Sequence, residues 1–151
     1  MENHKEIKRK LFETCMLFVE RQHKTVIDII ELNKTSLFSE TKSSAGDKHE
    51  TGRAMLQLEM EKASQQLTSI NQMKEVLSKI STENTSDIVC LGSLILTSKE
   101  NYYLSISIGK ITINNIDYYA VSTNSPIGQQ LLGKRVKSII PFNNAEISST
   151  Y

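Results

Sequence analysis

One stretch constrains the fold more than any other: residues 6–80 contain no proline, and Gly46 and Gly52 are their only glycines. In two parts of this stretch, a set of mostly apolar residues recurs at steps that alternate between four and three positions, which places them in a stripe along one side of a helix. Such a period of about 3.5 residues is typical of a helix that packs lengthwise against another helix. The first stripe comprises Phe12, Met16, Val19, His23, Val26, Ile30, Asn33 and Leu37, and the second comprises Leu56, Met60, Ala63, Leu67, Ile70, Lys74 and Leu77.

The two stripes predict an N-terminal antiparallel α-helical coiled-coil hairpin over residues 1–80, with its tip near residues 39–52. The polar segment 39–44 separates arms of similar length, and an arm that folds back on the other buries both stripes. An arm of about 30 residues at ~1.5 Å per residue is roughly 45 Å long, which suits reaching better than enclosing a pocket. Periodicity alone also allows a dimeric bundle or a compact helical domain.

The remainder of the chain has a different period. After a polar linker at residues 81–87, β-branched and aromatic residues gather in short segments separated by turn signals, which predicts an antiparallel sheet. Ser125 as N-cap, Pro126 at the first helical position and Gly133 as a stop predict one short helix. The expected fold class is therefore α+β, with a small β domain at residues 88–151. The expected strands are 88–97, 102–108, 111–113, 118–121, 136–140 and 145–151.

Composition narrows the function classes. The chain is 38% hydrophobic and 23% charged, which is ordinary for a soluble protein, and its net charge of +1 offers no overall attraction to nucleic acid. Sequence-specific DNA binding is not expected. The apolar runs are far shorter than the roughly 20 residues that span a membrane, and no secretory leader is recognisable, so we expect a cytoplasmic protein without a membrane partner. Cys15 and Cys90 are predicted to be buried small hydrophobic residues.

Basic and histidine residues add little chemistry. The basic residues near the start of the first helix predict either a solvated helix face or a contact patch. The three histidines lack partners at ligand spacing, and His23, on the first stripe, is expected at the edge of the core. Phosphate-binding loops and nucleophile motifs are absent from the sequence, so an autonomous enzyme is not expected. The basic residues are Lys5, Lys8, Arg9 and Lys10.

One acidic pair stands out, Asp47 and Glu50, at the expected turn between the arms. Residues three positions apart at a helix start lie on one side, where two carboxylates can share a divalent cation. The same spacing is also that of a capping box, with Asp47 as N-cap, and spacing alone favours the capping role. Two carboxylates are too few to hold Mg²⁺ tightly, so a metal role requires a partner that completes the site.

The C-terminal half contains a more specific pattern. The segment 121–134, VSTNSPIGQQLLGK, resembles the signature of bacterial Gre transcript-cleavage factors, and residues 91–97, LGSLILT, resemble the first strand of the same domain. The order of the two halves is also similar to that of the family, in which an antiparallel coiled coil precedes an FKBP-like β domain. The resemblance extends over essentially the whole chain.

This resemblance implies a partner and a mechanism. Gre factors dock on RNA polymerase and insert the coiled coil into its secondary channel. Gly46, Asp47 and Glu50 fall on the Gly-Asp-x-x-Glu positions of the family, which implies that both carboxylates help hold a catalytic Mg²⁺ shared with the polymerase. The polymerase then cleaves backtracked RNA near its 3′ end. The resemblance therefore implies a monomeric transcription elongation factor that stimulates the nuclease activity of the polymerase and is not itself an enzyme.

The sequence departs from the family at the tip, where Lys48, His49 and Arg53 add positive charge that either contacts RNA phosphate or weakens metal affinity. A channel-binding regulator or inhibitor without cleavage activity is therefore the main alternative. Ser125, Pro126 and Ile127 are the candidate docking residues, although a role of this segment in shaping and burying the short helix is the favoured explanation. A prolyl isomerase is a less favoured alternative. It needs an aromatic-lined pocket, which the tyrosine pairs are not expected to form because neighbouring residues of a strand point to opposite faces. An oligomerising coiled-coil adaptor is a further alternative.

Overall fold

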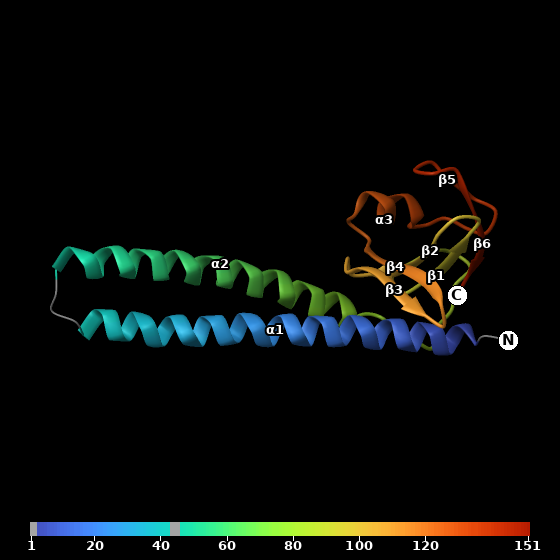
Figure 1. Cartoon of the computed structure of the whole chain (residues 1–151). Coiled ribbons are helices and arrows are strands. Elements are labelled where there is room, and N and C mark those ends of the chain that lie inside the picture. The colour runs from blue at the N-terminus through green and yellow to red at the C-terminus, as the bar shows by residue number, and fades with distance from the viewer. Residues whose placement is uncertain (1–2, 43–45) are drawn as a thin grey trace. The chain divides into compact units, whose positions relative to one another are not determined.

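The computed structural model describes residues 3–42 and 46–151, and for residues 40–42 and 46–50 it describes the backbone alone. The chain forms two compact units. The sheet unit comprises Met1–Phe18 and Glu75–Tyr151, and the helix unit comprises Val19–Lys74. Helices α1 (His4–Lys42) and α2 (Gly46–Ser78) each contribute residues to both units (Figure 1). The architecture is thus α+β, with a long helix pair followed by a sheet.

In the helix unit, α1 and α2 run in opposite directions (Figure 1). Every stripe position in this unit is buried or half-buried, and Val19, Val26 and Ala63 are at most 3% exposed. A helix on its own cannot bury a stripe, so the two helices cover each other. The alternating steps in the sequence therefore predicted correctly which positions of the helix unit are shielded from water.

The sheet unit contains six strands, in the spatial order β3-β4-β2-β1-β6-β5. Four neighbouring pairs are antiparallel, but β2 and β4 run parallel, with Tyr102 opposite Tyr119. The sheet is mixed, and the expectation of a purely antiparallel sheet is wrong. The strands are β1 (Leu94–Thr97), β2 (Asn101–Ser105), β3 (Gly109–Ile113), β4 (Ile116–Ser122), β5 (Ile139–Ile140) and β6 (Ala145–Thr150).

The parallel pair results from the position of β3 at the edge of the sheet. β3 and β4 form a hairpin whose turn residues, Asn114 and Asn115, have φ angles of 52° and 65°. Positive φ at both central residues is the turn geometry that matches the twist of tightly joined strands. Because β3 lies on the outside, β4 returns beside β2 and in the direction of β2. The asparagine pair predicted the turn, but local alternation carries no information about strand order.

The first strand is shorter than predicted, because the chain turns before it. Gly92 has a φ of 91°, in the left-handed region that favours glycine. A Cβ atom at this position would lie 3.1 Å from Cγ2 of Ile80. Residues 88–93 therefore form a turn-containing segment, and regular pairing begins only at Leu94.

The sheet is covered on both faces within the sheet unit. On one face, Leu131 of the short helix α3 (Pro126–Leu131) belongs to the main hydrophobic cluster. On the other face, Sγ of Cys15 on α1 lies 3.7 Å from Oγ of Ser105 on β2. The first turns of α1 thus complete the core of the sheet unit. The main cluster comprises Val89, Ile95, Tyr102, Leu104, Leu131, Ile140, Ala145 and Ile147.

Candidate functional site

The predicted acidic pair lies at the start of α2. This helix begins at Gly46, so the backbones of Asp47 and Glu50 lie within its first five residues. The side chains of Asp47, Lys48 and Glu50 lie outside the described residues, so their role stays a prediction. Arg53, three residues after Glu50 on the same helix, is exposed.

The segment around α3 has the local structure that the sequence predicted. The Ser125 hydroxyl donates to the carbonyl oxygen of Ser122 at 2.7 Å and accepts from the backbone N–H of Gly128 at 3.1 Å. Ser125 is thus the N-cap, and Pro126 follows at the first helical position. Pro126 is exposed, whereas Ile127 is half-buried against the main cluster. The hydroxyl of Ser125 is therefore used in capping the helix, and docking by these three residues stays a prediction.

An apolar pocket of about 520 Å³ lies beside α3 in the sheet unit. The rings of Tyr102 and Tyr119 are 6.3 Å apart, because the parallel register of β2 and β4 places both residues on one face. Burial raises the pKa of Tyr102. The expectation that the tyrosines form no aromatic-lined pocket is therefore wrong. The lining residues are Lys99, Glu100, Tyr102, Tyr119, Val121, Ile127, Phe142 and Asn143.

The basic start of α1 forms ion pairs within its own unit. Lys5 and Arg9 both pair with the carboxylate of Glu83, each at 2.5 Å. The hydrogen bonds from Lys5 and Arg9 lower the pKa of Glu83 to about 2. These contacts attach α1 to the segment that follows α2. Because the paired side chains stay about half exposed, the choice between a solvated face and a contact patch for a partner remains a prediction.

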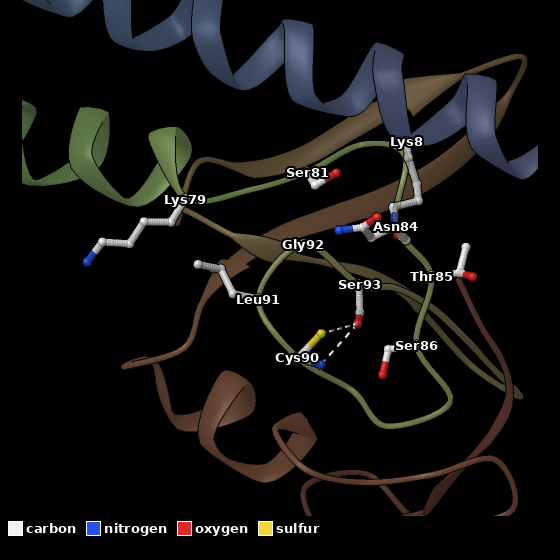
Figure 2. A pocket seen from close by; sticks show the side chains of 10 residues that line it. All are labelled: Lys8, Lys79, Ser81, Asn84, Thr85, Ser86, Cys90, Leu91, Gly92 and Ser93. Carbon is white, nitrogen blue, oxygen red and sulfur yellow. Dashed lines mark hydrogen bonds between the residues drawn. The ribbon is translucent and has the colours of Figure 1, made fainter.

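Lys8, from the same helix, occupies a different environment. Its side chain is only 2% exposed, and its ammonium donates to the main-chain oxygen of Asn84 at 2.9 Å. Burial lowers the pKa of Lys8. The ammonium lies at a polar cavity of about 160 Å³ between α1 and residues 79–93 (Figure 2). No short motif in the sequence indicates this cavity, although the spacing of Ile7, Leu11 and Cys15 marks the buried face beside Lys8.

The cysteines divide between the core and the surface. Cys15 is fully buried, as predicted, and burial raises the pKa of its thiol. Cys90 is exposed, so the prediction of its burial is wrong. The chain turns at residues 91 and 92, and Cys90 lines the polar cavity, where its backbone N–H donates to Oγ of Ser93 at 3.0 Å.

The histidines are accounted for by packing where the structure describes them. The ring of His4 stacks on that of Tyr151 with centroids 3.8 Å apart, and His23 is half-buried at the core edge, as expected. Among the described residues, no three histidine, cysteine, aspartate or glutamate side chains gather into a possible metal site. No helix within the described ranges is long and apolar enough to cross a membrane.

Comparison with known proteins found no protein-family model that matches this chain and no curated protein that matches it.

Proposed function

We propose that this protein is a Gre-like transcription elongation factor that binds RNA polymerase and stimulates the cleavage of backtracked RNA. The observation that carries the proposal is the position of Asp47 and Glu50 within the first five residues of α2, at the end of a long helix pair. The short helix with its Ser125 cap and Pro126 start, inside the segment that resembles the family signature, supports the same class. The finer fold belongs to this proposal: a coiled-coil hairpin followed by an FKBP-like domain.

In this proposal, the chain supplies ligands and the polymerase performs the reaction. The carboxylates of Asp47 and Glu50 would help hold a Mg²⁺ ion shared with the polymerase, and the bound ion would supply an activated water for phosphodiester cleavage. Cleavage leaves a new RNA 3′ end that can be extended. Arg53 and Lys48 would contact the RNA phosphates that pass close to this site. The protein would work as a cytoplasmic monomer without sequence-specific DNA contacts.

The test is RNA cleavage in a halted, backtracked polymerase complex. Asp47→Ala combined with Glu50→Ala should lower the stimulated cleavage rate by at least ~10-fold, because loss of metal ligands weakens a shared site. Polymerase binding should persist, since the docking segment is unchanged. A matched control, Glu59→Ala with Glu61→Ala, removes the same charge from exposed positions further along α2 and should cleave normally. If Asp47→Ala with Glu50→Ala stimulates RNA cleavage in the backtracked complex as well as the wild type does, the metal role is excluded.

The alternative is a channel-binding regulator that does not stimulate cleavage. The exposed Arg53 favours it, because a cation close to two carboxylates opposes binding of a second cation. This alternative predicts that the protein binds polymerase and slows elongation while Asp47→Ala with Glu50→Ala changes nothing. Arg53→Ala would then weaken the inhibition.

The aromatic pocket supports prolyl isomerisation as a second alternative function. Tyr102, Tyr119 and Phe142 line an apolar pocket of about 520 Å³, within the size range of small-ligand sites, which is ~300–1,000 Å³. A proline-peptide isomerisation assay decides this alternative. Activity that disappears in Tyr119→Ala would support it, and absence of activity in the wild type would exclude it.

A further inference from the structure

The polar cavity at Lys8 has features that the proposed function does not use. All of its lining residues belong to the sheet unit, and none of them is acidic. Four of the lining residues carry a hydroxyl group: Ser81, Thr85, Ser86 and Ser93. A hydroxyl can donate a hydrogen bond as well as accept one, so this wall can solvate a negative charge.

Lys8 supplies the charge. An ammonium has three N–H donors, and the bond to the Asn84 carbonyl accounts for one of them. Within the described residues, Lys8 forms no other hydrogen bond and no ion pair. A cation that is only 2% exposed and, among the described residues, has no carboxylate within ion-pair distance is costly to fold, since burial removes its hydration. An anion in the cavity would offset this cost.

The nearby charged groups leave this role to Lys8. The Glu83 carboxylate, next in sequence to Asn84, is paired with Lys5 and Arg9. Lys79 pairs with Glu75 at 3.5 Å, and its side chain points away from the cavity (Figure 2). The side chains of Lys8 and Asn84, in contrast, extend toward one space (Figure 2). The cavity therefore has a positive interior and a polar amide at its wall.

The size of the cavity limits the ligand. A cavity of about 160 Å³ has room for several water molecules or for one small ion. This space accepts a tetrahedral oxyanion but not a nucleoside, since sites for larger ligands begin at ~300 Å³. We infer that the cavity binds a small tetrahedral oxyanion of the phosphate class, held by the Lys8 ammonium and the surrounding hydroxyl groups. The inference does not rest on the proposed function.

The test is calorimetric titration of the intact protein with sodium phosphate, at constant ionic strength maintained with sodium chloride. The wild type should bind phosphate, and Lys8→Met should weaken binding by at least ~10-fold, because a charge-assisted hydrogen bond is lost. Lys10→Met is the matched control, since Lys10 lies on the same helix, is exposed and approaches Glu6 at 4.0 Å. It should bind phosphate like the wild type.

A second variant keeps the inference testable if Lys8→Met folds poorly. Asn84→Asp retains the main-chain oxygen that accepts from Lys8 and adds a carboxylate at the cavity wall. This variant should lose phosphate binding, and without phosphate it should melt at a higher temperature than the wild type. The inference is overturned if a titration with sodium chloride alone gives the same binding heat as the titration with phosphate. It is also overturned if Lys8→Met binds phosphate as tightly as the wild type, or if Asn84→Asp retains phosphate binding.

Two sources of the oxyanion can be separated with the same variants. Adenosine monophosphate presents the same group as a monoester, with its nucleoside left outside the cavity. Binding of this nucleotide that depends on Lys8 would support the inference and assign the site to a phosphate monoester. Phosphate binding without nucleotide binding would support it with the free ion as ligand.

Discussion

A Cβ atom built on Gly128, in the first turn of α3, would lie 1.8 Å from the carbonyl oxygen of Ser122, at the end of β4. No real pair of atoms approaches so closely without bonding. The same carbonyl accepts the hydroxyl hydrogen of Ser125, which in turn caps the helix through Gly128. The close approach of helix and strand therefore depends on the missing side chain at Gly128.

Gly128→Ala should destabilise the sheet unit by about 3 kcal/mol or more, because the clash is with backbone and cannot be relieved by a rotamer change. Urea unfolding followed by tyrosine fluorescence measures the effect, since all five tyrosines lie at residues 102–151. Gln129→Ala, at the next and exposed position, should change the free energy of unfolding by less than ~0.5 kcal/mol. Equal stability of the two variants would contradict the close approach.

Asn33 should limit the stability of the helix unit. Its side chain is 4% exposed, and among the described residues its amide nitrogen has no hydrogen-bond partner. Asn33→Leu should raise the free energy of unfolding by about 1–2 kcal/mol, because an unsatisfied buried donor is replaced by an apolar group. Urea unfolding followed by helical circular dichroism tests this. Lys34→Leu, at the exposed neighbouring position, should not raise the free energy of unfolding. A lower free energy of unfolding in Asn33→Leu would show that the Asn33 amide is hydrogen-bonded in the folded protein.

The two thiols should differ in reactivity. Cys90 is exposed, whereas Cys15 is 0% exposed and burial raises its pKa. Because the thiolate is the reactive form, iodoacetamide should modify Cys90 in the native protein and reach Cys15 only in urea. Peptide mass spectrometry locates the label. Cys90→Ser should remain unlabelled under native conditions, and rapid labelling of Cys15 in that variant would argue against its buried position.

Protonation of Glu83 should make the free energy of unfolding fall at acidic pH. Its pKa is lowered from 4.5 to about 2 by the hydrogen bonds from Lys5 and Arg9, so the folded state binds this proton less readily than the unfolded state. The stabilising contribution is therefore complete above pH 4.5 and is lost as the pH falls toward 2. Carbon NMR of the carboxyl measures the titration. Glu83→Gln should flatten the pH dependence, whereas Glu13→Gln should not, and added salt should weaken the effect.

The sequence predicted features with a local cause. The stripes of α1 and α2 repeat along one helix face, so their spacing indicated the buried positions of the helix unit. Ser125, Pro126 and Gly133 predicted α3, because capping and the fixed φ of proline act within a few residues. Asn114 and Asn115 predicted the hairpin turn for the same reason.

The features that the sequence did not reveal depend on distant parts of the chain. The parallel pairing of Tyr102 with Tyr119 follows from the strand order, and the aromatic pocket follows from that pairing. The burial of Lys8 follows from its contact with Asn84, 76 positions away. The resemblance at Gly46, Asp47 and Glu50, and not their spacing alone, indicated a candidate pair for catalysis in a partner, and this role stays a prediction. The cavity at Lys8 had no short motif to indicate it.

The division of α1 between two units determines how this protein can be dissected. Ile7, Leu11 and Cys15 are buried members of the sheet unit, although more than sixty residues of helix unit and connection separate them from the strands. A fragment that starts at the polar linker would expose the sheet face that these side chains cover. An autonomous sheet unit therefore has to carry the opening turns of α1 on the same polypeptide or receive them as an added peptide.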